Sequence, residues 1–189
     1  MGVEVEKKYR LTRDELKLLE RRLVETGAVR RGPEEFEVNT LYGGRGLDPR
    51  TRVLRLRRTG ERALFTYKER DASDSAIKRQ REDETEVSDP AALAAILDAL
   101  GYRPALVYEK RRTTWHVSDV ELVIDELPFG LFMEIEGTEN AIVEAEALLH
   151  LTETEAVLET YPELAARHGV KRGEMVEARF GQRDVARQD

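Results

Sequence analysis

Short segments in which charged and apolar residues alternate recur along the whole chain. In "VLRLRR" Arg55 and Arg57 share one side of a predicted strand, and Leu54 and Leu56 share the other, because strand side chains alternate with a period of two. For a single strand of this kind, exposure of the charged side to solvent is a sufficient explanation. Six strands that each hold charges in phase need a cover for their apolar sides, so we expect helices outside a curled sheet and charged rows inside it.

The order of these segments is repeated. Thr12 and Glu15 form a capping box, and leucines at helical spacing follow until Gly27. This predicts a strand, a helix and three strands, in residues 2–11, 12–27, 36–42, 52–58 and 63–69. A second round begins in "REDETEVSDPAALAAILDALG". Its strand holds Glu84 and Glu86 at a spacing of two, and its helix starts at Asp89 and Pro90 and ends at Gly101. Its three strands are predicted in residues 105–117, 120–126 and 131–137.

Two rounds give eight strands, which can pair edge to edge and leave no exposed sheet edge. The predicted fold is therefore α+β: a closed eight-stranded antiparallel β-barrel with helices packed on the outside. The glycine-rich "GGRGLDP" at 43–49 is interpreted as a turn. After residue 138 we expect helices, in "GTENAIVEAEALL", from a capping box of Thr152 and Glu155, and in "YPELAARHG". Residues 1–180 are predicted to form one domain, and residues 181–189 a disordered tail.

Charge and composition limit the partners. The net charge of -7 and the lack of basic-aromatic patches argue against nucleic acid, yet 31 Lys and Arg remain for a local basic site. No apolar run is long enough to span a bilayer, so no membrane contact is expected, and the cytoplasm is the default location. With no Cys and three scattered His, a metal would need carboxylate ligands, which favours Mg or Mn.

A barrel interior lined with cations and carboxylates is costly unless its charges are compensated. We therefore expect an anionic ligand with metal ions inside; the alternative is an interior network of salt bridges without a ligand. Because side chains alternate along a strand, Arg57 should point into the barrel, and Arg58, one residue later, should point away from it.

The charged rows resemble the CYTH family, the triphosphate tunnel metalloenzymes. Glu4-x-Glu6-x-Lys8 matches the ExExK signature of that family. Later residues follow the family's order over about residues 2–168: Arg55-x-Arg57, Lys68, Glu84-x-Glu86, Lys110-x-Arg112, Asp125 and Glu134-x-Glu136. The chain looks most similar to the bacterial branch labelled class IV adenylyl cyclase. It departs from the family in the second strand: an Asp often comes soon after the Tyr of that strand in the family, whereas here Gly43 follows Tyr42.

The resemblance implies an eight-stranded tunnel that binds a triphosphate-containing small molecule with a divalent metal. The implied substrate-binding residues are Lys8, Arg55, Arg57, Lys68, Lys110 and Arg112, since Arg forks and Lys charges suit phosphate oxygens. The implied metal ligands are Glu4, Glu6, Asp125, Glu134 and Glu136, with Glu84 and Glu86 as supporting candidates. Lys68 and Glu6 are the catalytic candidates, with Lys68 orienting or deprotonating the nucleophile. Glu82 and Glu86 fit equally well as structural partners of the basic residues.

Three functions share this apparatus. Attack by water makes the protein a triphosphatase, which is our first hypothesis because no residues clearly read an adenine base. Attack by the ribose 3′-hydroxyl of ATP makes it an adenylyl cyclase that releases pyrophosphate. A non-catalytic sensor of polyphosphate or nucleotides is the third. The organic part of the substrate, the choice and number of metals, and the oligomeric state, including a homodimer, stay open at this point.

Overall fold

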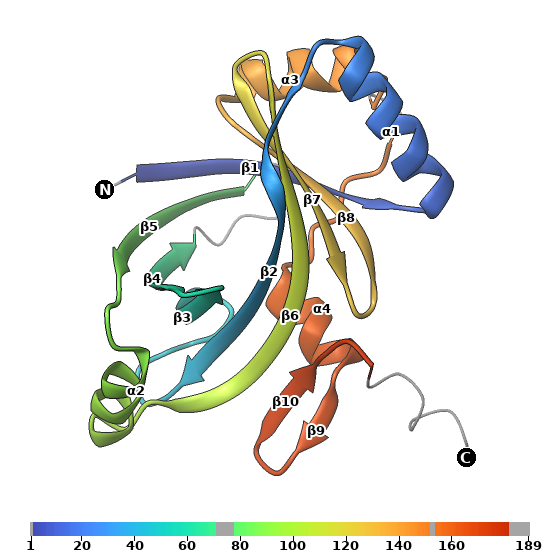
Figure 1. Ribbon diagram of the computed structural model, residues 1–189. Helices are drawn as coiled ribbons and strands as arrows, with labels where there is room; N and C mark the ends of the chain where they lie inside the picture. Colours follow the sequence, from blue (N-terminus) through green and yellow to red (C-terminus); the bar gives the residue numbers. More distant parts are fainter. Residues whose placement is uncertain (1, 71–77, 152–153, 182–189) are drawn as a thin grey trace.

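Eight long strands curl around a central space (Figure 1). The structure, a computed structural model, describes residues 2–70, 78–151 and 154–181, with side chains described in 5–69, 81–151 and 154–181. The eight strands are β1 (Gly2–Leu11), β2 (Val29–Gly43), β3 (Arg52–Thr59), β4 (Arg62–Arg70), β5 (Lys78–Glu86), β6 (Arg103–Val117), β7 (Val120–Leu127) and β8 (Gly130–Glu136). All eight were predicted from the alternating pattern.

The strands pair in the order β2-β3-β4-β5-β1-β8-β7-β6, and β2 also pairs with β6. Each of these pairings is antiparallel. If β1, β2, β3 and β4 are exchanged with β5, β6, β7 and β8, respectively, every pair of neighbouring strands is again a pair of neighbours. The repeat in the sequence is therefore also a repeat in space. Because β1 pairs with β5 only through Gly2–Glu6 and with β8 through Glu6–Leu11, the sheet is strongly curled but less fully closed than predicted.

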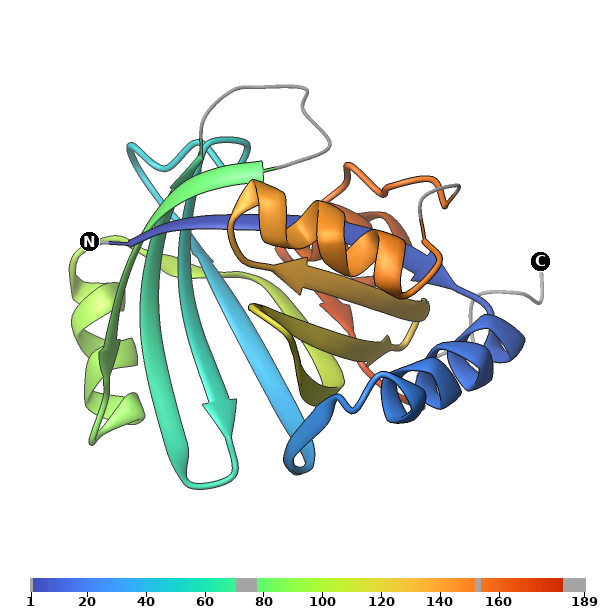
Figure 2. The same ribbon diagram turned by 90° about the horizontal axis from the view of Figure 1, so that it is seen from above.

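Helices cover the outside of this sheet, as predicted. Helices α1 (Arg13–Glu25) and α3 (Glu139–Leu148) lie on one side, and α2 (Pro90–Ala99) lies on the opposite side (Figure 1, Figure 2). Under α1 and α3 the core includes Tyr9, Leu23, Met133, Ile135 and Ile142, all fully buried. This cluster holds the apolar faces of β1 and β8 and so orients the charged faces of the same strands inward.

The predicted ends of the first two helices are confirmed. Thr12 and Glu15 form the capping box of α1, and Gly27 follows the helix with a φ of 75° that suits glycine. Asp89 caps α2 through the backbone amides of Ala91 and Ala92. No helix among the described residues is long and apolar enough to cross a membrane.

The chain after α3 differs from the prediction. Thr152 lies outside the described residues, and residues 154–160 are not helical, since Ala156 instead forms a β-bridge with Tyr9. The capping box is eight residues later, at Thr160 and Glu163, and opens α4 (Tyr161–His168). Two short strands then follow, β9 (Val170–Arg172) and β10 (Met175–Ala178), which were not predicted. The predicted tail lies outside the described residues, apart from Gly181.

Helix α4 fills one part of the interior. Tyr161, Leu164 and Ala165 of this helix pack against Val53 and Phe132, which share the inward faces of β3 and β8 with the charged residues. Strand β10 lies parallel to β6 beside it and pairs with residues 106–108. The charged part of the interior therefore has an apolar wall at the α4 side.

Candidate functional site

Six cationic side chains line one pocket inside the curled sheet. They come from four strands: Lys8 on β1, Arg55 and Arg57 on β3, Lys68 on β4, and Lys110 and Arg112 on β6. These are the six residues predicted to bind substrate. Arg58 does not line the pocket and is exposed on the opposite face of β3, so the predicted strand phase is confirmed. Period two explains the convergence, because each strand turns the same face inward.

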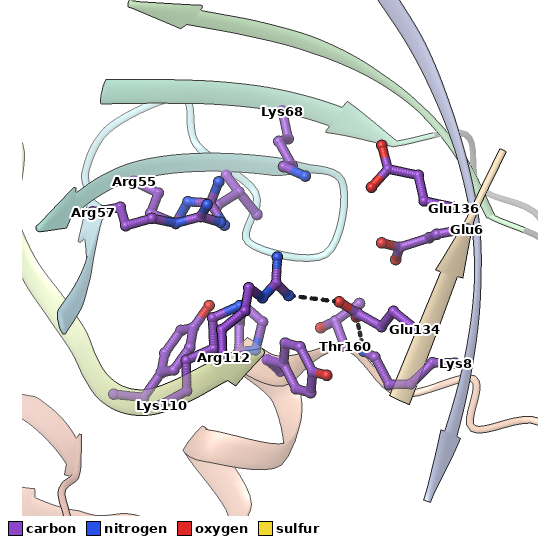
Figure 3. A pocket seen from close by; sticks show the side chains of 14 residues that line it. Glu6, Lys8, Arg55, Arg57, Lys68, Lys110, Arg112, Glu134, Glu136 and Thr160 are labelled. Carbon is purple, nitrogen blue, oxygen red and sulfur yellow. Dashed lines mark hydrogen bonds and ion pairs between the residues drawn. The ribbon is translucent and has the colours of Figure 1, made fainter. Parts of the chain in front are cut away.

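Three of the predicted carboxylates face these cations. Glu6 of β1 and Glu134 and Glu136 of β8 line the same pocket and project toward the cationic wall (Figure 3). Glu6 is directly opposite Glu136 in the pairing of β1 with β8, and Lys8 is opposite Glu134. The side chain of Glu4, predicted as a ligand, lies outside the described residues. The pocket thus has a carboxylate wall and a cationic wall.

A continuous chain of ion pairs crosses the site. It runs from Lys8 to Glu134 (3.3 Å), to Arg112 (3.0 Å), to Asp125 (2.6 Å), to Lys110 (3.4 Å), to Glu37 (3.4 Å) and to Arg57 (3.3 Å). Charges of opposite sign alternate along it, so each buried charge is compensated. The salt-bridge network that was the alternative to a bound ligand is therefore present, and it borders a pocket.

Asp125 lies behind this pocket and not among its lining residues. Its side chain is fully buried, and its two carboxylate oxygens accept hydrogen bonds from Arg112 at 2.8 and 2.6 Å. Burial opposes ionisation, but Arg112 and Lys110 outweigh it and lower the pKa of Asp125. This geometry suits a residue that fixes the Arg112 fork, whereas the sequence interpretation placed Asp125 among the metal ligands.

Glu37 on β2 has the same position behind the cations and was missed in the sequence. It is 2% exposed, contacts Lys110 and Arg57, and accepts a hydrogen bond from Asn39. Burial alone raises the pKa of a carboxyl, but Lys110, Arg57 and Arg112 outweigh burial and lower the pKa of Glu37 to about 2. The signal that could have found it is the polar row Glu35, Glu37 and Asn39, alternating with Phe36 and Val38.

Lys110 is the most confined cation of the site. It is 1% exposed, between Asp125 and Glu37. Burial, reinforced by Arg112, lowers the pKa of Lys110 to about 8 in spite of these two carboxylates. The charge of this side chain therefore depends on pH near neutrality.

The supporting carboxylates of β5 have structural partners. Glu84 accepts a hydrogen bond from Thr66 at 2.8 Å and lies 3.9 Å from Arg55. Glu82 contacts Lys68 at 2.8 Å and Arg55 at 3.6 Å, which agrees with its interpretation as a partner of basic residues. Glu86 pairs with the exposed Arg62 at the far end of the strand. None of the three lines the pocket.

Helix α4 brings aromatic and polar groups that the sequence did not predict at the site. Thr160 and Tyr161 line the pocket, and the Tyr161 ring lies 3.9 Å from the ammonium of Lys8 and 5.4 Å from that of Lys110. The backbone carbonyl of Glu159 accepts a hydrogen bond from Lys8. Burial and the carboxylate of Asp125 raise the pKa of Tyr161 well above its ordinary value, so its hydroxyl stays protonated.

The carboxylate wall fits a hard divalent cation. Among the described residues no three carboxylate or imidazole groups are placed to hold a metal ion by themselves. Mg²⁺ needs fewer, because it is commonly bound by one or two carboxylates and completes its coordination with water and phosphate oxygens. Glu6 and Glu136 lie opposite each other on adjacent strands of the pocket wall, where two carboxylates could be offered to such an ion. The donor set therefore suits Mg or Mn bound together with a phosphate.

Comparisons with known proteins agree with this geometry. A family model described as the CYTH domain matches residues 2–163. A search of curated proteins finds no significant match. The solved structure of the PH1012 protein from Pyrococcus horikoshii has a TM-score of 0.74 at 24% identity, covering 85% of this chain and 98% of that chain.

Two further solved structures carry descriptions of activity. A Vibrio parahaemolyticus protein described as a candidate adenylate cyclase has a TM-score of 0.70 at 21% identity, covering 87% of this chain and 98% of that one. A Hippeastrum protein described as having a dominant triphosphatase activity has a TM-score of 0.65 at 18% identity, covering 86% and 94%. At these identities the likeness shows a shared fold alone.

Proposed function

The chain belongs to the CYTH domain family, and we propose that it hydrolyses a linear triphosphate in the charged pocket with the help of Mg or Mn. The observation that carries this proposal is the convergence of six cations from four strands on one pocket, opposite a wall of carboxylates. A triphosphate spreads its negative charge over many oxygens, and cations from several directions match that distribution. The substrate class is inorganic tripolyphosphate or an organic triphosphate.

One unsatisfied group supports an anionic ligand. The Nε atom of Arg55 is buried and has no hydrogen-bond partner among the described residues, although its side chain lines the pocket. A buried donor without a partner is costly, and a phosphate oxygen is the acceptor that the surrounding positive charge favours. Arg57 and Arg112 can donate to neighbouring phosphate oxygens with the guanidinium N–H groups that Glu37 and Asp125 do not hold.

The groups behind the pocket prepare these cations for binding. Glu37 and Asp125 hold Arg57, Lys110 and Arg112 from the side away from the pocket. A cation that is already fixed in place loses little conformational freedom when phosphate binds, so the binding free energy is not spent on ordering the site. Glu37 and Asp125 are positioning residues in this account.

Phosphoryl transfer then depends on placement and charge compensation. Glu6 and Glu136, with Glu134, are the residues that would hold the metal, and the metal would supply Lewis-acid stabilisation of the phosphoryl oxygens. Lys68 is fixed by Glu82 at 2.8 Å and lines the pocket, so its ammonium can donate a hydrogen bond to the attacking water or to the transferred phosphoryl group. In-line attack by water releases phosphate without a covalent intermediate.

Hydrolysis is favoured over cyclisation by the lining of the pocket. Among the described residues that line the pocket, the aromatic rings are those of Tyr108 and Tyr161; Tyr108 is 2% exposed, and the Tyr161 ring already contacts Lys8. Neither presents an open face to adenine. If the ribose 3′-hydroxyl of ATP attacked in place of water, the same cations would serve an adenylyl cyclase, so the products distinguish the two reactions.

The test is product analysis with purified protein. Tripolyphosphate, ATP and thiamine triphosphate are each incubated with Mg or Mn, and the products are separated by ion chromatography. Release of orthophosphate from at least one of these triphosphates, abolished in Lys68→Met but kept in the control Lys17→Met on the exposed face of α1, supports the proposal. Cyclic AMP and pyrophosphate from ATP, formed faster than any hydrolysis, would contradict it in favour of the cyclase. Tight binding of a triphosphate without turnover would favour a sensor.

A further inference from the structure

Glu134 differs from the other carboxylates of the ion-pair chain in its position. It lines the pocket, and each of its oxygens contacts one cation: Oε1 lies 3.3 Å from Lys8 and Oε2 lies 3.0 Å from Arg112. Figure 3 shows both contacts on the pocket side of these cations. The Glu134 carboxylate therefore occupies a place where a phosphate would meet Lys8 and Arg112.

The two carboxylates behind the cations leave room for a ligand, whereas Glu134 does not. Asp125 and Glu37 are buried away from the pocket and can keep their contacts while a phosphate binds in front. A phosphate that approaches Lys8 and Arg112 meets the Glu134 carboxylate, and two anions on the same pair of cations repel each other. Phosphate binding at these two cations thus competes with Glu134.

The neighbours of Glu134 offer it a second position. Glu136 is two residues further along the same face of β8, about 6.6 Å away along the strand at about 3.3 Å per residue. Glu6 lies opposite Glu136 on β1. A metal ion held at Glu6 and Glu136 would attract the Glu134 side chain away from Lys8 and Arg112 through a change of side-chain rotamer.

We propose that Glu134 is an internal competitor of the triphosphate and that metal binding removes it from Lys8 and Arg112. This inference rests on the proposed function, because it assigns a triphosphate and a metal to the same pocket. It makes the two ligands cooperative: the metal increases the affinity for the triphosphate and the triphosphate increases the affinity for the metal by the same factor. The pocket is thereby protected from free anions until the metal arrives.

Calorimetric titration of a triphosphate analogue tests the competition. In imidotriphosphate, NH groups replace the bridging oxygens, so turnover does not contribute heat. In EDTA, Glu134→Gln should bind the analogue at least about tenfold more tightly than the unsubstituted protein, the scale of one lost charge contact in a desolvated site. The matched control is Glu126→Gln, which also removes one negative charge but pairs with Arg13 and Arg111 on the outer face. It should change the affinity less than about twofold, as expected for a surface ion pair.

The same titration in Mg²⁺ tests the coupling. The gain in affinity caused by the metal should be at least about tenfold for the unsubstituted protein and for Glu126→Gln, and below about threefold for Glu134→Gln. Complexation of the analogue by Mg²⁺ in free solution is common to all three proteins, so it cancels when their gains are compared.

Equal or weaker binding by folded Glu134→Gln in EDTA overturns the inference and leaves the proposed hydrolysis standing, because product release is assayed separately. A metal-induced gain that Glu134→Gln retains in full also overturns it. If Glu134→Gln does not fold, Glu134→Asp replaces it, and its carboxylate, one methylene shorter, should tighten binding in EDTA by a smaller factor. No binding by any variant, with or without Mg²⁺, overturns the proposed function together with this inference.

Discussion

Replacing Arg57 and Arg58 separately compares two neighbouring arginines that the strand turns to opposite sides. Arg57 lines the pocket and lies 3.3 Å from Glu37, with 18% of its side chain exposed. Arg58 is exposed on the outer face. After Arg57→Ala, Glu37 keeps Lys110 at 3.4 Å and Arg112 at 4.0 Å, so its charge remains compensated and the fold should persist.

The expected losses differ by more than measurement error. Truncating a desolvated charge that binds a partner charge costs about 2–5 kcal/mol, while an exposed charge is worth under about 1 kcal/mol. At about 1.4 kcal/mol per decade, Arg57→Ala should weaken tripolyphosphate binding at least about tenfold, and Arg58→Ala less than about fivefold. Calorimetric titration measures both affinities, and circular dichroism checks that both variants are folded. Equal losses, or a larger loss for Arg58→Ala, would refute the inward orientation of the charged rows as the basis of binding.

Three further outcomes are expected. Because the pKa of Lys110 is lowered to about 8, the affinity for triphosphate should fall as pH rises through 8, while the free energy of unfolding should rise between pH 8 and about 10.5. Calorimetry compares the protein with Lys110→Arg, for which the ligand's own titration is the same. Identical pH profiles for the two proteins would contradict this expectation. Because the pKa of Glu37 is lowered to about 2 from 4.5, the Glu37 carboxylate should contribute on the order of 3 kcal/mol to stability above pH 4.5, and this contribution should be lost as pH falls toward 2. In urea unfolding between pH 2 and 6, the free energy of unfolding of Glu37→Gln should therefore fall less steeply with decreasing pH. The same dependence on pH in both proteins would count against the assigned ion pairs. Hydrolysis should cease in EDTA and return with Mg or Mn, with Glu6→Gln requiring more metal for half-maximal rate; full turnover in chelator would remove the metal from the account.

The inward cations could be predicted from sequence because a single rule fixes their direction. Once Leu54 and Leu56 are assigned to the apolar face of β3, Arg55 and Arg57 must lie on the other face. The helix caps at Thr12 and Asp89 were equally local, since a side chain there contacts amides two or three residues away. Local rules of this kind predicted the eight long strands and helices α1 to α4.

The missed features depend on contacts between distant residues. Glu37 becomes a positioning group only because β2 pairs with β6, which brings it beside Lys110. Likewise Asp125 looks like any carboxylate in sequence, and its role follows from the two bonds to Arg112 across the β6–β7 pairing. Strand β10 has four residues, too few to show a period, and it forms by pairing with β6. The capping box of Thr160 and Glu163 was not predicted, and the helix that it opens is fixed by packing that places Tyr161 inside the sheet.

A crystal structure of the protein with imidotriphosphate and Mn²⁺ tests the central claim most directly. Anomalous scattering locates the manganese, and the phosphates are visible in the density. The account predicts phosphate oxygens within hydrogen-bond distance of Arg55, Arg57 and Arg112, and a manganese peak beside Glu6 and Glu136. A triphosphate bound on the outer face of the sheet, or manganese and phosphate in separate places, would contradict it.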